Sequence, residues 1–247
     1  MSKILFIIPA RSSSKRVKNK NIRNIGKSSL IENKIKTCLK TKIGDVVVTT
    51  DSKKIANVSK KIGAKVPFLR PKKYSTSTAT MMSSVLHLLR FLKDNSKELP
   101  SFIAIMPPTY PFISPNSIKR AFTKIKNNNK LVSICAFSES NEHPYSYVKN
   151  DKKLKFNILK YAGKKLLNYE RTQDYPKAFV LSGAIRISRI SYFLKHLKNK
   201  SSSIKNYVID FNSCLGFKIS KREAYDINDK NDFNIAKFLE KNKKIFK

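Results

Sequence analysis

The chain has 247 residues, enough for one large α/β domain or two small ones, and its 40% hydrophobic and 10% aromatic residues exclude a disordered or collagen-like chain. Its 52 basic and 16 acidic residues give a net charge of +36. Because the lysines are spread from Lys3 to Lys247, we interpret the charge as a solvated surface, with a polyanion partner as the alternative. We expect no nucleic-acid binding beyond nonspecific charge attraction.

Strands and helices alternate in the first part of the chain. Residues 4–9 form a continuous apolar run, which is typical of a strand buried on both faces of a parallel sheet. Ser29 and Glu32 have the spacing of a capping box, so a helix is predicted to begin there. A second buried strand is predicted at 45–50, followed by a helix that Gly63 ends.

The alternation continues after residue 80. Helices are predicted at 82–92, from Ser114 onward, at 190–197 and at 232–239, and strands at 102–106, 131–137, 178–187 and 207–211. This pattern predicts an α/β fold, a three-layer sandwich with a mostly parallel sheet. Ligands of such sheets bind at the carboxyl ends of the strands.

Residues 143–175 interrupt this pattern with short apolar pieces separated by lysines. We predict a hairpin and an extended, inserted arm there rather than another strand and helix. Because such an insertion has few ways to bury its apolar face alone, a contact with a second subunit is expected. His143, at the start of the arm, either lines a substrate site or makes a turn.

Cysteine usage and hydropathy indicate the cellular compartment. Cys38, Cys135 and Cys214 cannot all pair and lack C-x-x-C spacing, which excludes a disulfide framework and a structural zinc site. The run at 4–9 is too short to span a membrane, and Arg11 follows it at once, unlike in a signal peptide. We expect a soluble, cytoplasmic protein with no membrane partner.

The loop after the first strand is the first candidate binding site. Neither G-x-G-x-x-G nor a Walker A sequence occurs in the chain. Residues 9–16 instead combine a proline and an alanine with two arginines, three serines and a lysine, and Lys18, Lys20 and Asn21 follow. These cations and hydroxyls can surround a triphosphate at a strand end. The alternative is an ordinary solvated loop.

Six motifs resemble those of the CMP-sialic acid synthetases, the acylneuraminate cytidylyltransferases, in order and spacing. They lie at 7–21, 46–51, 66–71, 108–112, 171–176 and 226–228, and the resemblance extends from Ile4 to about Leu239. It implies a nucleotide-diphospho-sugar transferase-like fold in a single cytidylyltransferase domain, 1–247, and a homodimer formed through an inserted dimerisation arm at about 143–175. It further implies Mg²⁺-dependent transfer of CMP from CTP to a nine-carbon 2-keto sugar acid, a nonulosonic acid, with release of pyrophosphate.

The resemblance also implies roles for single residues. The catalytic residues are Arg11, Lys20 and Asp226. CTP is bound by Arg11, Ser14, Lys15, Lys20, Asn21 and Arg70. The sugar acid is bound by Thr109, Arg171, Gln173 and Arg186, and the metal by Asp226 and Asn228. Such a set suits nucleotidyl transfer, which needs cations and a metal on the phosphates.

Several positions depart from the family pattern. Asn228 replaces the second metal-binding aspartate, and Pro107 replaces a glutamine that precedes Pro-Thr. Arg186 ends a stretch that reads Asn-Gly-Ala-Ile-Tyr in the family, and it either pairs with an acceptor carboxylate or merely projects from an outer strand face. We therefore expect an acceptor other than plain N-acetylneuraminate, of pseudaminic or legionaminic type. Asp229 and Asp232 are interpreted as helix caps.

Two other functions stay open from the sequence. Asn228, Pro107 and the charge of +36 would also suit a catalytically degenerate member of the fold that binds nucleotide or polyanion. A related nucleotidyltransferase with another base or sugar is the third possibility. Nucleotide binding is favoured in all three cases by the joint retention of Arg11, Lys15, Lys20 and Asn21.

Overall fold

The structure is a computed structural model that describes residues 4–13, 16–95, 98–150, 156–158, 169–201 and 207–242, with main chain alone at 148–150 and 156–158. Six strands form one sheet in the order β2-β1-β3-β7-β4-β8. These strands are β1 (Ile4–Pro9), β2 (Gly44–Thr49), β3 (Phe102–Ile105), β4 (Ser133–Glu139), β7 (Phe179–Arg189) and β8 (Cys214–Lys218). Only β7 runs antiparallel to its neighbours, β3 and β4, so the prediction of a mostly parallel sheet is confirmed.

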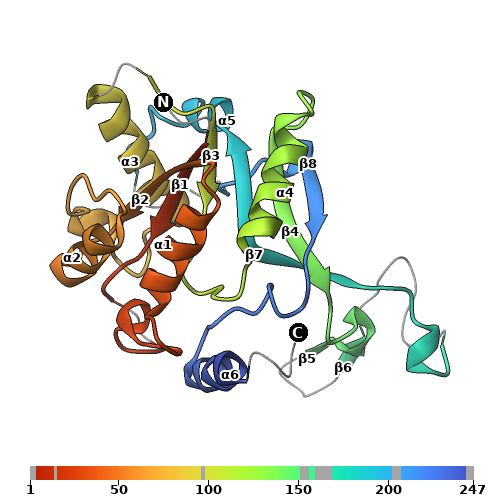
Figure 1. Cartoon of the computed structure of the whole chain (residues 1–247). Helices are drawn as coiled ribbons and strands as arrows, with labels where there is room; N and C mark the ends of the chain where they lie inside the picture. The colour runs from red at the N-terminus through yellow and green to blue at the C-terminus, as the bar shows by residue number, and fades with distance from the viewer. Residues whose placement is uncertain are drawn as a thin grey trace.

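Helices cover both faces of this sheet (Figure 1). On one face lie α1 (Leu30–Lys40), α2 (Lys53–Ile62) and α4 (Pro115–Lys126), and on the other lie α3 (Met81–Asn95) and α5 (Ile190–Leu194). The last helix, α6 (Lys230–Lys241), packs against Leu30 at the start of α1 through Phe233 and Ala236. The predicted three-layer sandwich is therefore confirmed. No helix in the described ranges is long and apolar enough to cross a membrane.

The β1 strand shows why its sequence is apolar throughout. Phe6 and Ile8 point into the core beneath α1, α2 and α4, whereas Leu5 and Ile7 point into the core beneath α3 and α5. Successive side chains of a strand face opposite sides, so a central strand needs apolar residues at every position. Each of these burials contributes about 1.5–3 kcal/mol before entropy costs.

Local capping signals place the helix ends where the sequence predicts them. The Ser29 side chain accepts from the Glu32 main chain, and the Glu32 carboxylate accepts from Ser29 in return. Asp229 and Asp232 make the same reciprocal box at the start of α6, which confirms their interpretation as caps. Gly63 ends α2 with φ of 102°, a left-handed conformation that glycine adopts without strain.

The strand predicted near the C-terminus is wrong, and one predicted helix is shorter than expected. Residues 207–211 are not a strand, and the edge strand is β8 at Cys214–Lys218. The main chain of the earlier segment bonds to side chains instead, since Asp210 N donates to Ser133 Oγ at 2.8 Å and Val208 O accepts from Ser188 Oγ at 3.2 Å. The helix predicted at 190–197 ends its regular part at Leu194.

The arm begins after β4 and stands away from the sheet (Figure 1). Its strands β5 (Val148–Asn150) and β6 (Phe156–Ile158) pair antiparallel, so the predicted hairpin is confirmed. His143 Nδ1 accepts from Tyr145 N at 3.2 Å, and His143 Nε2 lies 2.8 Å from Pro176 O. His143 therefore makes a turn that joins the two ends of the arm.

Candidate active site

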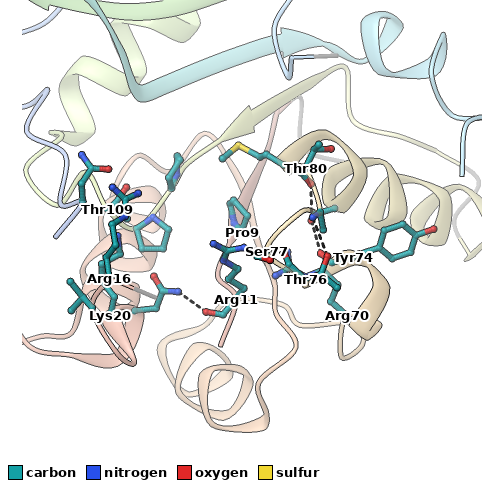
Figure 2. A pocket seen from close by; sticks show the side chains of 18 residues that line it. Pro9, Arg11, Arg16, Lys20, Arg70, Tyr74, Thr76, Ser77, Thr80 and Thr109 are labelled. Carbon is teal, nitrogen blue, oxygen red and sulfur yellow. Dashed lines mark hydrogen bonds between the residues drawn. The ribbon is translucent and has the colours of Figure 1, made fainter. Parts of the chain in front are cut away.

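A cavity of about 710 Å³ opens at the carboxyl ends of β1 and β3. Its lining comes from four parts of the chain, the loop after β1 (9–21), the segment from Arg70 to Ser84, residues 107–109 and Asn228. Figure 2 shows Arg16, Lys20 and Thr109 on one side and Arg70 and Tyr74 on the other, with Arg11 between them. Of the residues predicted from the sequence, six line this cavity: Arg11, Lys20, Asn21, Arg70, Thr109 and Asn228.

Arg11 is held in place by both neighbouring segments. Its Nη1 donates to Thr76 O at 3.0 Å, and its own carbonyl accepts from Asn21 Nδ2 at 3.0 Å. The next residue, Ser12, donates from its main-chain N and its Oγ to the Asp51 carboxylate at 2.7 and 2.6 Å. The loop is thus fixed without a glycine, and the Arg11 guanidinium is oriented before any ligand arrives.

Lys20 joins the loop after β1 to the C-terminal part of the chain. Its Nζ donates to Ile227 O at 2.6 Å. Burial lowers the pKa of Lys20, while the nearby carboxylate of Asp226 opposes this shift and Arg16 adds to it. The ammonium is therefore a fixed donor near two arginines, Arg11 and Arg16, and two carboxylates, Asp226 and Asp232, and is a suitable partner for a phosphate oxygen.

Arg70 is a buried cation on the side of the cavity opposite Lys20 (Figure 2), with 5% of its surface exposed. Its main-chain N donates to Thr50 O at 2.7 Å, and its Nε donates to Ser75 Oγ at 3.0 Å. Burial lowers the pKa of Arg70, and Asp51 opposes the shift. An arginine stays charged in such surroundings, so it places a positive charge next to the cavity in a medium of low dielectric constant.

The segment before α3 is a part of the cavity that the sequence reasoning missed. Thr76, Ser77 and Thr80 line the cavity, and Thr80 Oγ1 accepts from Ser83 N at 3.1 Å at the first turn of α3. The N-terminal end of this helix therefore faces the same space as the cations. Helix N-termini and hydroxyls bind anions well. Five hydroxyl residues among the six at 75–80, directly before a helix, were the available signal.

Tyr110 and Asp226 meet beside the cavity. The Tyr110 hydroxyl lies next to the Asp226 carboxylate and the main-chain N–H of Gly183, and burial together with the Asp226 charge raises the pKa of Tyr110 to about 12. The adjoining main chains are also joined, since Ile227 N donates to Thr109 O at 2.9 Å. Asp226 itself does not line the cavity.

Arg186 lies on β7, between β3 and β4. Its Nη1 lies 3.5 Å from Met81 Sδ, and Met81 lines the cavity. A Cβ at Gly183 would lie 2.7 Å from both Arg186 Nη2 and Tyr110 Oη. The absence of a side chain at Gly183 therefore lets Arg186 and Tyr110 approach each other.

The metal-binding capacity of the site is small. Within the described ranges no three His, Cys, Asp or Glu side chains come together as a metal cluster. Asp226 Oδ1 is buried without a hydrogen-bond partner, and Asn228 is exposed on the cavity wall. One carboxylate and one amide fit Mg²⁺ bound mainly through substrate phosphates and water, which is its usual mode, and do not fit a zinc site.

Two predicted site residues within the described ranges lie away from this cavity, on the arm. Arg171 and Gln173 lie on the arm, where Arg171 donates from Nε and Nη2 to Asp174 at 2.9 and 3.0 Å. Both residues are exposed. Ser14 and Lys15 lie outside the described residues.

Solved structures of nucleotidyltransferases share this fold. The structure of CMP:2-keto-3-deoxy-manno-octonic acid synthetase complexed with CTP superposes with a TM-score of 0.71 at 13% identity, covering 98% of this chain and 100% of the other. The 4-diphosphocytidyl-2C-methyl-D-erythritol synthase of Anaerococcus prevotii superposes with a TM-score of 0.63 at 12% identity, covering 97% of this chain and 99% of the other. The predicted fold class is therefore confirmed.

Sequence comparison identifies relatives and a family. The chain is 27% identical to the pseudaminic acid cytidylyltransferase of Campylobacter jejuni (strain 81-176), covering 97% of both chains. It is 28% identical to the CMP-N,N'-diacetyllegionaminic acid synthase of C. jejuni (strain NCTC 11168), covering 97% of this chain and 95% of the other. The Legionella pneumophila CMP-N,N'-diacetyllegionaminic acid synthase is 36% identical over 131 residues, which are 53% of this chain and 56% of that protein. The cytidylyltransferase family model matches residues 5–245, and the chain therefore belongs to the cytidylyltransferases, a family of nucleotidyl-transferring enzymes.

Proposed function

We propose that the protein transfers CMP from CTP to a nine-carbon 2-keto sugar acid and releases pyrophosphate. The observation that carries this proposal is the cavity in which Arg11, Arg16, Lys20 and Arg70 converge with the N-terminal end of α3 at the carboxyl ends of the strands. A site with four cations and a helix N-terminus suits a triphosphate. Nucleotidyl transfer needs no nucleophile from the protein, because the acceptor hydroxyl attacks the phosphate directly.

The proposed chemistry depends on positioning and charge. The anomeric hydroxyl of the sugar acid attacks the α-phosphorus and gives up its proton to solvent. The bond from the α-phosphorus to the α,β-bridging oxygen breaks, and pyrophosphate departs with the electron pair of that bond. Arg11 and Lys20, fixed by Thr76 O and Ile227 O, would hold the departing phosphates. Mg²⁺, when bound through Asp226, Asn228 and the phosphates, would supply further positive charge.

The acceptor would bind on the side of Tyr110 and Arg186. The Arg186 guanidinium contacts Met81, which lines the cavity. From this position it would pair with the carboxylate of a 2-keto sugar acid. The names of the relatives point to the pseudaminic or legionaminic type of nonulosonic acid. An enzyme that uses CTP to activate such a sugar acid would work in the cytoplasm, where CTP is available, and would supply the synthesis of surface glycans.

A homodimer would bury the apolar surface next to the arm. Tyr147, Phe179, Val180 and Leu181 expose 52%, 44%, 50% and 52% of their surfaces. Three of them are consecutive on β7, so both sides of that strand end expose apolar side chains. An arm that docks on a second copy would cover them and would bring the exposed Arg171 and Gln173 to the partner.

The test is pyrophosphate release with each of the four nucleoside triphosphates, Mg²⁺ and a panel of nonulosonic acids. We expect release that requires CTP, Mg²⁺ and one class of acceptor. An Arg186→Met variant, run in parallel, should raise KM for the acceptor about tenfold and leave KM for CTP unchanged, as expected for the loss of one charge-assisted contact. Folded protein that releases no pyrophosphate with any acceptor would favour the alternative, a catalytically degenerate nucleotide- or polyanion-binding protein.

A further inference from the structure

A lysine lies in the core behind one wall of the cavity. Lys34, on α1, exposes 1% of its surface, and its Nζ donates to Tyr110 O at 2.7 Å. Burial lowers the pKa of Lys34 to about 8, so near pH 7 the side chain is mostly an ammonium. A buried ammonium is costly, and the acceptor here is a carbonyl rather than a carboxylate. The reason for this contact is therefore to be sought in the segment that Lys34 holds.

This segment, which follows β3, is poor in main-chain donors. Three of the five residues at 107–111 are prolines, which have no N–H. The main-chain N of Tyr110 makes a long bond of 3.5 Å within the segment itself. Two carbonyls bond to other parts of the chain instead, because Thr109 O accepts from Ile227 N at 2.9 Å and Tyr110 O accepts from Lys34 Nζ. The segment is thus held from both sides through its acceptors.

The same bonds lead on to a cation of the cavity. Thr109 lines the cavity, and Figure 2 shows it on the same side as Lys20. Ile227, which donates to Thr109 O, accepts from Lys20 Nζ at 2.6 Å through its own carbonyl. Ile227 is fully buried, so this carbonyl is fixed by the chain around it. The position of the Lys20 ammonium therefore depends on the position of the segment at 107–111.

We propose that Lys34 is a positioning residue that fixes the segment at 107–111 from the core and, through Ile227, holds the Lys20 ammonium in place. The inference rests on the proposed function, in which Lys20 binds the phosphates of CTP. Lys34 itself does not line the cavity, so it acts through other residues. Without its ammonium, the Tyr110 carbonyl loses its donor, and the segment and Ile227 can shift together. Small displacements of groups that hold a substrate are costly for binding and rate.

The test measures CTP binding without turnover, by calorimetry with Mg²⁺ and no acceptor. Lys34→Met replaces the ammonium with an apolar group of similar size and should weaken CTP binding about three- to tenfold, the scale for a residue that acts without touching the ligand. Lys34→Gln keeps an N–H donor on a shorter side chain and should weaken it less. Lys36→Met is the matched control on the same helix, because Lys36 is exposed and its Nζ donates to Ser28 Oγ at 2.9 Å.

A double-mutant cycle with Lys20→Met separates positioning from a general loss of structure. If Lys34 acts through Lys20, Lys34→Met should cause little further loss of CTP affinity in the Lys20→Met background. Circular dichroism shows whether each variant is folded, and the cycle is run with Lys34→Gln if Lys34→Met does not fold.

Two results would overturn the proposal: unchanged CTP binding in folded Lys34→Met, or full additivity of the two lysine substitutions. An effect of Lys36→Met as large as that of Lys34→Met would also contradict it, because the loss would then come from any change of charge on α1. A wild-type protein that binds no CTP would instead contradict the proposed function, so the two failures are distinguishable.

Discussion

The two sides of the cavity are built differently. On the nucleotide side, defined by Arg11, Arg16, Lys20 and Arg70, three of the cations are anchored one by one to a carbonyl or hydroxyl of the scaffold. On the acceptor side, defined by Tyr110, Gly183, Arg186 and Asp226, the groups contact one another. Charges fixed by the scaffold are oriented in advance for any triphosphate, whereas groups that hold each other shift together when one is changed.

Because of this difference, substitutions on the two sides of the cavity should have different kinds of effect. Loss of an anchored cation removes one contact to the phosphates and leaves its neighbours in place. A change on the acceptor side alters a neighbour's position, so its effect should be shared with that neighbour. Additive effects on the nucleotide side and non-additive effects on the acceptor side would support the comparison.

The largest effect is expected on the nucleotide side. Lys20→Ala and Arg11→Ala should each lower kcat about 10²- to 10³-fold, the scale for one preoriented contact to developing charge. Steady-state kinetics of pyrophosphate release measures it. Lys18→Ala is the matched control, since Lys18 is exposed in the same loop and does not line the cavity. Losses below about threefold for Lys20→Ala would mean that this loop is only surface.

The next effect is the pH dependence of the free energy of unfolding that the buried Lys34 causes; this lysine lies in the core behind the acceptor side. The pKa of Lys34 is about 8 in the folded protein, below the ordinary lysine value of 10.5. Between these two pH values the unfolded chain binds more protons than the folded chain, so the free energy of unfolding rises with pH in this window. The shift corresponds to about 3 kcal/mol.

Urea denaturation of wild type and Lys34→Met between pH 7 and pH 10 measures this contribution. The difference, wild type minus variant, should increase with pH, because only the wild type has to bury an ammonium at low pH. In the folded protein the neighbouring Cys38 and Tyr110 stay protonated in this window, because the pKa of each is raised to about 12. Their titration in the unfolded chain is common to both proteins and cancels in the difference. A difference that does not change with pH would mean that Lys34 is not buried as a cation.

The smallest effect is expected at Asn228, where the two sides meet. Asn228 lines the cavity, and its main-chain N donates to Asp232 Oδ2 at 2.8 Å, which leaves the side chain to face the site. Asn228→Asp adds one negative charge for a hard cation and should lower the Mg²⁺ concentration at half-maximal activity several-fold without changing acceptor preference. Activity measured against Mg²⁺ for both proteins tests it, and identical curves would show that Asn228 is not at the metal.

The nucleotide side was largely predictable from the sequence because it follows local rules. An apolar strand at 4–9 places the next loop at the carboxyl edge of the sheet, and Arg11, Lys20 and Asn21 in that loop do line one cavity. The hydroxyl segment at 75–80 was missed because serine and threonine are common in ordinary loops. Their position at the start of α3, facing Arg11, depends on contacts between segments far apart in the chain.

The sequence by itself determined the alternation of strands and helices, the capped ends of α1 and α6, and the cationic loop, since periodicity and capping depend on residues a few positions apart. Only the tertiary structure decided that β8 and not 207–211 completes the sheet, where Gly216 leaves room for the Phe137 ring at 2.8 Å from a Cβ. It also decided that Lys34 is buried and that Tyr110, Gly183, Arg186 and Asp226 come together. A lysine on a helix is ordinarily exposed, and its burial here follows from the packing of α1 against the chain around Tyr110, a contact between residues 76 positions apart.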